Sequence, residues 1–311
     1  MSGIRDVARR AGVSIATVST VLNGSGPVSA KSRQAVLEAA SALGYAPNGI
    51  AQSLRKGRSR LIGLVVSEIA NPFFAALTRE IGRAAQAEGY SVIVCDTDED
   101  VARETAVLDV LRTQRVAGII LSPAGTGDAY AASLRSRVKV PLVIVDRMLP
   151  DIGCDFVGLD NRASGRLITE YLIRLGHRRI GFIAGRDGVS TSDDRHAGYV
   201  DALESAGIGV EPDLRVGADF RGHAAYDAVQ PLLTRGDRPS AIVAANNLMA
   251  LGALQAAHDL GFDCPRDISI AGIDDFPWSG AMRPRLTTVS QPIDSIERTA
   301  LERLLERLRS G

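Results

Sequence analysis

Short apolar runs alternate with helical segments through most of the chain, and this alternation constrains the fold more than any other feature. Each run is almost continuously apolar, which is typical of a strand buried on both faces of a parallel sheet. The segments between the runs, such as residues 71–89, have helical spacing. The runs are LIGLVV (61–66), YSVIVC (90–95), VAGIIL (116–121), PLVIV (141–145), FVGL (156–159), RIGFIAG (179–185), AIVAA (241–245) and ISIAGI (268–273).

Repeated strand and helix units predict an α/β body with parallel sheets that helices cover on both faces. The number of strands is large for one sheet and suits two, so we expect two lobes within residues 61–311. The chain is expected to change lobe near residue 160 and to return near residue 291. With 311 residues and 45% hydrophobic content, it is long enough for two or three compact domains.

Composition excludes several classes of protein. No stretch of about 18 apolar residues and no apolar leader occurs, so we expect neither a membrane protein nor a secreted one, and the cytoplasm is the expected compartment. The three cysteines, Cys95, Cys154 and Cys264, are scattered, which predicts structural thiols rather than a disulfide framework or a metal site.

The net charge of zero hides a strong asymmetry. Residues 1–60 hold nine Lys and Arg against two acidic residues, a net charge of +7, so the remainder of this neutral chain carries −7. A basic module of this size is typical of a surface that binds phosphate backbones. On charge alone, a merely solvated run of charges is the alternative.

The basic region also has the pattern of three short helices. Ile4, Val7, Ala8 and Ala11 form one apolar stripe that ends at Gly12, Ser14 is placed to cap a second helix that stops at Asn23, and Ser29 to cap a third. Val18, Val21 and Leu22 of the second helix, and Val36, Leu37, Ala40 and Leu43 of the third, are expected to face the core. This pattern predicts a helix-turn-helix headpiece over residues 1–46, and a purely structural three-helix bundle is the alternative.

Nearly the whole chain resembles the lactose-repressor-type (LacI/GalR) family of transcription regulators. The resemblance begins in IRDVARRAGVSIATVSTVLNGSG and LGYAPNGIAQSL, and continues through IGLVVSEIANPFF, PLVIVDR, GHRRIGFIAG, RHAGY, MALGAL and ISIAGIDDFPWSGAMRPRLTTVSQP. It implies a DNA-binding headpiece, a hinge helix and linker over residues 47–60, and a periplasmic-binding-protein-like body. It further implies a homodimeric repressor that binds a roughly palindromic double-stranded DNA operator under the control of a small polar effector such as a sugar or nucleoside, without a cofactor or metal.

The resemblance implies which headpiece residues meet DNA. Ile15 and Ala16 are expected to touch base edges by apolar contact, and Leu54 to insert as a wedge in the minor groove, with packing against a partner helix as its alternative. Thr17, Ser19 and Asn23 are expected to bond phosphates or hold the helix. The full set is Ser14, Ile15, Ala16, Thr17, Ser19, Thr20, Asn23, Asn48, Ala51, Gln52 and Leu54.

Polar residues directly follow the predicted strands, where ligands of open parallel sheets bind. They are Ser67, Asp96, Ser122, Asp146, Asp160 with Asn161, Asn246 with Asn247, and Asp274 with Asp275. Taken singly, each could be a helix cap; together they favour a polar ligand held between the lobes. Combined with the resemblance, this predicts an effector site of Phe73, Phe74, Ser122, Asp146, Arg195, Phe220, Asn246 and Asp274, with core packing as the alternative for Phe73 and Phe74.

Enzyme motifs are incomplete. GTGDAY has Tyr130 where a dinucleotide fingerprint needs glycine or alanine, and DTDEDV lacks the glycine and glutamate of a calcium loop at Val101 and Val107. The four histidines show no zinc-binding spacing. A sugar-acting or nucleoside-hydrolysing enzyme would leave the basic headpiece unexplained, and a transport-associated solute-binding protein would need a leader.

The chain departs from the family pattern at four places. Thr20 stands where a long polar side chain is common, Gly3 stands where a threonine often caps the first helix, and Asn247 replaces an aspartate. Family members usually continue beyond the position of Gly311, which leaves open whether the sequence is truncated and one lobe lacks an edge strand.

Overall fold

The computed structural model describes residues 3–23, 26–45 and 59–310 of the chain. The chain divides into two separate units, Met1–Ser59 and Arg60–Gly311. Most of the predicted hinge and linker, residues 47–58, lies outside the described residues. None of the described helices is long and apolar enough to cross a membrane.

The first unit contains three helices with local caps. They are α1 (Ile4–Ala11), α2 (Ile15–Asn23) and α3 (Ala30–Ala42). Gly3 has no side chain to cap α1, and instead its N–H donates to the Asp6 carboxylate at 2.9 Å. Ser14 Oγ accepts the Thr17 N–H at 3.0 Å at the start of α2, as the sequence predicts for a cap.

The headpiece core lies where the three helices meet. Val7, Val18 and Val36 are fully buried, one from each helix. The expectation that Leu37 belongs to the apolar face of α3 is wrong, because 47% of its surface is exposed. Ala39 packs in the core instead. At about 100° per residue, Ala39 lies about 60° from Val36 around the helix, whereas Leu37 lies about 100° from it, at the edge of the buried face.

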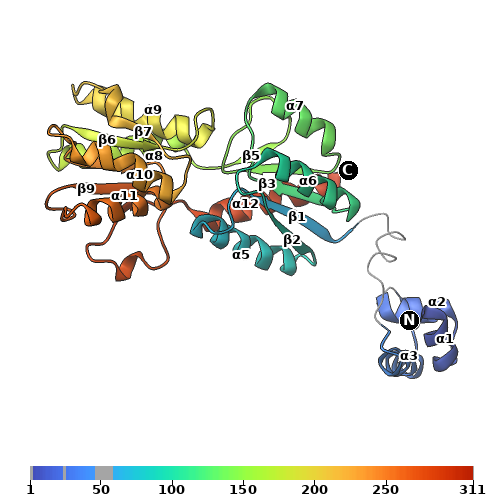
Figure 1. Ribbon diagram of the computed structural model, residues 1–311. Coiled ribbons are helices and arrows are strands. Elements are labelled where there is room, and N and C mark those ends of the chain that lie inside the picture. The colour runs from blue at the N-terminus through green and yellow to red at the C-terminus, as the bar shows by residue number, and fades with distance from the viewer. Residues whose placement is uncertain (1–2, 24–25, 46–58, 311) are drawn as a thin grey trace. The chain divides into compact units, whose positions relative to one another are not determined.

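The second unit contains two parallel five-stranded sheets, one in each lobe (Figure 1). The first sheet has the order β2-β1-β3-β4-β5, and its strands are β1 (Leu61–Val66), β2 (Ser91–Asp96), β3 (Gly118–Leu121), β4 (Leu142–Val145) and β5 (Asp155–Val157). The second has the order β10-β9-β8-β6-β7, and its strands are β6 (Ile180–Ala184), β7 (Arg215–Gly217), β8 (Ala241–Ala244), β9 (Ser269–Ile273) and β10 (Thr287–Val289).

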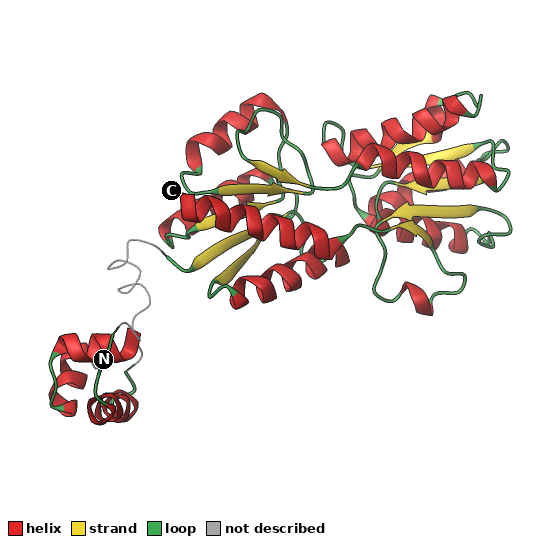
Figure 2. Cartoon of the chain, turned by 180° about the vertical axis from the view of Figure 1, so that it is seen from behind, coloured by secondary structure: helices red, strands yellow, loops and turns green. Residues whose placement is uncertain are grey.

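Helices cover both faces of each sheet (Figure 2). Those of the first lobe are α5 (Pro72–Ala87), α6 (Val101–Thr113), α7 (Gly127–Arg137) and α12 (Ile293–Ser310). Those of the second are α8 (Asn161–Arg174), α9 (Ser190–Ser205), α10 (Gly222–Thr234) and α11 (Asn247–Asp259), with short 3-10 turns at Pro212–Leu214 and Ser279–Ala281. The chain enters the second lobe between β5 and α8, and it returns between β10 and α12, which packs on α5 and β4.

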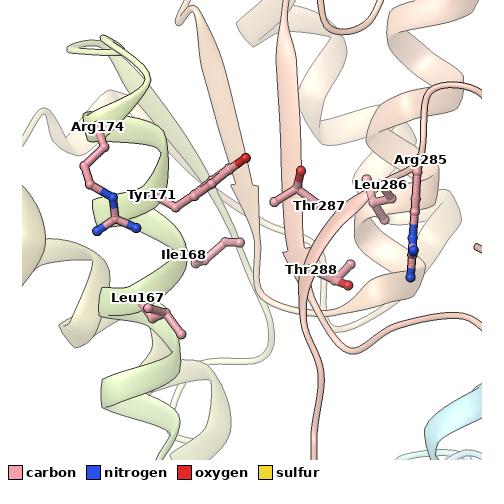
Figure 3. A pocket seen from close by; sticks show the side chains of 8 residues that line it. All are labelled: Leu167, Ile168, Tyr171, Arg174, Arg285, Leu286, Thr287 and Thr288. Carbon is pink, nitrogen blue, oxygen red and sulfur yellow. The ribbon is translucent and has the colours of Figure 1, made fainter.

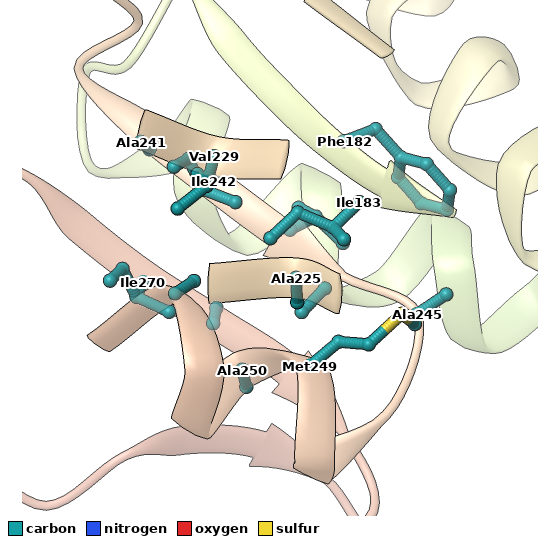
Figure 4. Close-up of a cluster of buried hydrophobic side chains, with 14 of the residues drawn as sticks. Phe182, Ile183, Ala225, Val229, Ala241, Ile242, Ala245, Met249, Ala250 and Ile270 are labelled. Carbon is teal, nitrogen blue, oxygen red and sulfur yellow. The ribbon is translucent and has the colours of Figure 1, made fainter. Parts of the chain in front are cut away.

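Each lobe has its own hydrophobic core. In the second lobe, Phe182 of β6 and Met249 of α11 are fully buried among strand residues from β8 and β9 (Figure 4). Burying one large apolar side chain contributes about 1.5–3 kcal/mol. The cores therefore hold each sheet rigidly and fix the directions in which the strand ends point.

Two glycines bring helices α8 and α9 into backbone contact. A Cβ at Gly165 would lie 2.0 Å from the Arg195 carbonyl oxygen, and a Cβ at Gly198 would lie 2.0 Å from the Arg162 carbonyl oxygen. Side chains at these positions would separate the helices. The contact places the first half of α8 directly beside Arg195 of α9.

Candidate functional site

The carboxyl ends of the strands bring polar side chains from both lobes to one buried region, which we call the interlobe cleft. In the first lobe, Ser67 Oγ and Ser122 Oγ lie 2.8 Å apart. Both serine side chains are buried, and so are other polar residues that the sequence predicted at the ends of strands. The buried set includes Ser67, Ser122, Asp146, Asn161, Arg195, Asn246, Asn247 and Asp274.

Arg195 reaches the cleft from α9 and is 2% exposed. Its Nε donates to Asn161 Oδ1 at 2.9 Å, and its Nη1 donates to the Ala245 carbonyl oxygen at 2.6 Å. Nη1 also lies 4.0 Å from Asp274 Oδ2. Groups from three elements of the second lobe therefore surround the guanidinium, because α8 and the ends of β8 and β9 each contribute one.

Asp274 follows β9 in a left-handed backbone conformation, with φ of 72°. Its Oδ1 accepts a hydrogen bond from Gln291 Nε2 at 2.7 Å. Burial raises the pKa of Asp274, and Arg195 opposes that rise. Gln291 Oε1 is buried without a hydrogen-bond partner among the described residues, so an acceptor is available beside this carboxylate.

Asp146 and Arg147 form the corresponding charged pair of the first lobe. Arg147 donates from Nη1 and Nη2 to the two Glu99 carboxylate oxygens, each at 2.5 Å. Its Nε lies 3.5 Å from Asp146 Oδ2 and has no hydrogen-bond partner within the part of the chain that the structure describes. Burial raises the pKa of Asp146 to about 6, although Arg147 and Arg195 act in the opposite direction.

Phe220 comes from the second lobe and faces the Arg147 guanidinium, whose central carbon lies 5.2 Å from the ring centroid. The ring lies so close to Gly185 that a Cβ there would be 2.2 Å from it. Asn246 Nδ2 donates to the Phe220 carbonyl oxygen at 3.1 Å, and Asn246 Oδ1 accepts the Met249 N–H at 2.8 Å. Asn246 therefore caps α11 and also supports Phe220.

Phe73 and Phe74 lie in the core of the first lobe. Each is 4% exposed, and their ring centroids are 5.0 Å apart in an edge-to-face arrangement. This placement fits the core-packing alternative. Their contact with an effector stays a prediction.

Three residues of the cleft were not singled out as effector contacts by the sequence. Arg147 directly follows Asp146 in PLVIVDR, and Gln291 ends the stretch TTVSQ, so neighbouring motifs offered a signal for both. Asn71 Oδ1 accepts the Phe73 N–H at 3.0 Å and lies 3.4 Å from Asn247 Nδ2 of the other lobe. Only the fold brings Asn71 and Asn247 together.

A separate pocket of about 420 Å³ lies between α8 and β10 (Figure 3). None of the predicted effector residues lines it. Its walls are Leu167, Ile168, Tyr171, Arg174, Arg285, Leu286, Thr287 and Thr288.

The predicted DNA-contacting residues of α2 lie near its exposed start. Ile15 is 42% exposed and Ala16 is exposed, whereas Thr17, Ser19 and Thr20 are half-buried. Thr20 Oγ1 donates to the Ala16 carbonyl oxygen at 2.9 Å. Asn23 ends the helix, and Asn48, Ala51, Gln52 and Leu54 lie outside the described residues.

Family models match both units of the chain. The model for bacterial regulatory proteins of the lacI family matches residues 3–48, and the model for a periplasmic binding protein-like domain matches residues 169–311. The match to the headpiece supports the helix-turn-helix interpretation over a structural bundle.

Full-length relatives agree with these matches. The chain is 35% identical over 308 residues to the Ribose operon repressor of Halalkalibacterium halodurans, covering 99% of this chain and 91% of that protein. It is 34% identical over 311 residues to the HTH-type transcriptional repressor PurR of Erwinia tasmaniensis, covering 100% and 91%. Among solved structures, the lac repressor dimer bound to operator and the anti-inducer ONPF is 30% identical, with a TM-score of 0.88 and coverage of 99% and 93%.

Similarity at this level over nearly the full length of the relatives confirms the fold class and the family resemblance. The chain belongs to the lacI family of bacterial regulatory proteins, and it is a DNA-binding transcription regulator rather than an enzyme.

Proposed function

We propose that the chain is a homodimeric cytoplasmic repressor whose operator binding is controlled by an uncharged sugar, a pentose such as ribose, held in the interlobe cleft. The observation that carries the choice of ligand is the pair of buried charged groups in each lobe, Asp146 with Arg147 and Arg195 with Asp274. The headpiece, residues 1–46, binds a roughly palindromic operator, residues 47–60 form the hinge, and residues 61–311 bind the effector.

The charges of the cleft favour a neutral ligand. Two cations, Arg147 and Arg195, face the carboxylates of Asp146, Glu99 and Asp274, so the cleft carries no excess positive charge. A ligand that brought its own charge into this buried region would leave that charge without a dedicated partner. This argues against a phosphorylated sugar.

The hydrogen-bonding groups favour a polyhydroxy ligand. A sugar hydroxyl donates to a carboxylate or amide oxygen and at the same time accepts from a guanidinium. Gln291 Oε1 and Arg147 Nε are a buried acceptor and a buried donor that lack partners among the described residues. Phe220 adds an apolar face on which a sugar ring can rest.

The residues that we propose as effector contacts keep the set predicted from the sequence. A purine base has a flat apolar surface and few donors, so it would use the two carboxylates poorly. The ribose and purine repressors among the relatives make both ligand classes testable. The proposed contacts are Phe73, Phe74, Ser122, Asp146, Arg195, Phe220, Asn246 and Asp274, joined by Arg147 and Gln291.

Calorimetric titration of the full-length protein tests this choice of ligand. D-ribose is expected to bind, because its hydroxyls satisfy both signs of charge, whereas D-ribose 5-phosphate and hypoxanthine are expected to bind at least tenfold more weakly. Asp274→Asn should weaken ribose binding, and Arg166→Gln, a surface change that removes the ion pair with Glu170, should not. Tight binding of hypoxanthine without binding of ribose would assign the cleft to nucleobases instead.

A further inference from the structure

Two arginines of the second lobe reach across to acidic residues of the first. Arg221 Nη1 donates to Glu68 Oε1 at 3.1 Å, and its Nη2 donates to Asp98 Oδ1 at 2.6 Å and to the Asp98 carbonyl oxygen at 3.1 Å. Arg221 directly follows Phe220, so it lies one residue from the interlobe cleft. These bonds join loops that are more than a hundred residues apart in the chain.

The second arginine, Arg186, makes a similar crossing. Its Nη1 donates to the Glu99 carbonyl oxygen at 3.1 Å, and its Nη2 donates to the Ala124 carbonyl oxygen. Nη2 also lies 3.7 Å from Glu99 Oε2. Each arginine therefore combines ionic attraction with bonds to main-chain carbonyls, which fixes its position more closely than an ion pair alone would.

Local contacts within the first lobe fix the positions of the groups that accept hydrogen bonds from these arginines. Asp98 and Glu99 have φ of 50° and 62°, an uncommon conformation for two consecutive residues with side chains. The Glu99 N–H donates to the Ser67 carbonyl oxygen at 3.0 Å. Glu104, which is 1% exposed, accepts the Ala124 N–H at 2.7 Å and the Tyr130 hydroxyl at 2.5 Å.

We propose that Arg186 and Arg221 form an ionic clamp that sets how tightly the two lobes close, and thereby tunes the affinity for the effector. Glu99 couples the clamp to the cleft, because the same carboxylate accepts both hydrogen bonds from Arg147 and faces Arg186. The clamp itself rests on the interlobe contacts alone. Its effect on affinity rests also on the proposed function.

The clamp differs from the other contacts between the lobes in its dependence on salt. Met148 N–H donates to Ser190 Oγ at 2.8 Å, and Asn71 pairs with Asn247, but neither contact involves a charged group. The Arg147 guanidinium contacts the Phe220 ring, but Arg147 is buried, so salt screens this contact little. Arg221 and Asp98 are 27% and 48% exposed, so added salt screens their attraction. We therefore expect salt to open the lobes through the clamp, while the neutral contacts are little affected.

Distances between spin labels on the two lobes, measured by pulsed electron paramagnetic resonance, test the clamp without any ligand. Spin labels are attached to cysteines introduced at Ala132 on α7 and Glu204 on α9, both exposed, in a full-length protein whose three native cysteines are replaced by alanine. Labelled protein is diluted with unlabelled protein so that distances within one subunit dominate. Circular dichroism and thermal unfolding confirm that each variant is folded.

The R186Q/R221Q variant is expected to give a longer and broader interlobe distance distribution than the parent protein. Raising the salt from 50 mM to 500 mM should lengthen the distances in the parent but not in this variant. Arg166→Gln is the matched control, because it removes an arginine whose ion pair lies within α8, and it should leave the distribution unchanged. Identical distributions in the double variant and the parent would overturn the clamp.

Charge exchange and ribose titration complete the test. Arg221→Asp should open the lobes, and Arg221→Asp combined with Asp98→Arg should restore the parent distance, which a simple loss of packing would not predict. The R186Q/R221Q variant should bind D-ribose roughly three- to tenfold more weakly, because a smaller fraction of the protein is closed. Altered distances with unchanged ribose affinity would reject the effect on affinity, whereas no ribose binding by the parent would reject the proposed ligand and leave the distance result standing.

Discussion

Arg195 Nη1 lies 4.0 Å from Asp274 Oδ2, a distance at which the two side chains attract each other but do not use up each other's hydrogen-bonding groups. Arg195 donates instead to Asn161 and to the Ala245 carbonyl, while Asp274 accepts from Gln291. Both charged groups are thus held in place by neutral partners. The arrangement leaves them facing each other with capacity for a ligand hydroxyl that bonds to both.

Removing Arg195 should strongly weaken effector binding. Arg195→Ala removes a buried cation that donates hydrogen bonds to Asn161 and to the Ala245 carbonyl, and it leaves Asp274 buried without the cation that faces it. Removal of such a group costs about 2–5 kcal/mol in binding. Calorimetry with D-ribose measures the loss, and operator binding should persist because the headpiece is a separate unit. A variant that responds to the effector at unchanged concentration would place the effector site elsewhere.

Acidification should weaken effector binding. Burial raises the pKa of Asp146 to about 6, so protonation below that pH removes the carboxylate that accepts sugar hydroxyls. We expect the affinity to fall between pH 7 and pH 5 in calorimetric titrations. Asp146→Asn should bind ribose weakly at both pH values and lose most of this dependence. An equally steep fall in that variant would assign the dependence to another group, such as Asp274.

The same pKa shift makes an opposite prediction for stability. Because the folded-state pKa of Asp146 lies above its ordinary value of 3.8, the folded protein binds the proton more tightly than the unfolded chain does. This contribution to the unfolding free energy is fully present below about pH 4, declines as the pH rises through about 6, and is absent above it. The stabilities of the ligand-free protein and of Asp146→Asn, measured by denaturant unfolding, should therefore diverge between about pH 4 and pH 6, with the variant gaining stability relative to the parent, and should stay apart by a constant amount above pH 6.

DNA binding should depend steeply on salt and require the headpiece. The described basic residues of the headpiece, Arg5, Arg9, Arg10, Lys31 and Arg33, are all exposed. Neutralising several phosphates per subunit makes the logarithm of affinity fall linearly with the logarithm of salt concentration. A protein that begins at Leu61 should not bind the operator in a fluorescence anisotropy titration. Equal binding by both proteins would contradict the assignment of the headpiece.

Thr20→Arg should change the preferred operator at one base pair in each half-site. The Thr20 hydroxyl bonds the Ala16 carbonyl within its own helix, whereas an arginine could donate to a guanine edge. Such a contact discriminates between bases by roughly 1–3 kcal/mol. Selection from a randomised DNA library checks this, and the same consensus sequence from both proteins would count against placing Thr20 in the groove. Thr20→Val is the control, because the valine side chain has no hydrogen-bond donor that could reach a base.

The sequence pattern predicted every long strand but missed two short ones. Apolar runs such as LIGLVV mark strands in the middle of a sheet, because both of their faces are buried. The strands β7 and β10 have three residues each, lie at the edges of the second sheet and contain arginine, glycine or threonine. They lack the apolar run that marks even the edge strands β2 and β5 of the first sheet, so only pairing with β6 and β9 identifies them.

The cleft was predictable in part for a similar reason. Residues that directly follow a strand, such as Asp146 and Asp274, could be placed because parallel strands present their carboxyl ends at one edge. Hydrogen-bond partners that come from distant segments of the chain could not be predicted in this way. Glu99 contacts Arg147 within the first lobe, 48 residues along the chain, and Glu68 contacts Arg221 of the second lobe, and no local sequence pattern records either pairing.

The backbone contact between α8 and α9 has a mechanical consequence. Helices joined this closely at Gly165 and Gly198 leave little freedom within the second lobe, so we expect effector-driven motion to be a rigid-body rotation about the two segments that cross between the lobes. Gln291 lies in one of these segments, so a ligand bound beside it acts at the pivot. The linker to the headpiece joins the first lobe at the opposite, amino end of β1, which at about 3.3 Å per residue is some 20 Å away. That strand is a lever arm, and a rotation of a few degrees at the pivot becomes a displacement on the order of an ångström where the linker begins.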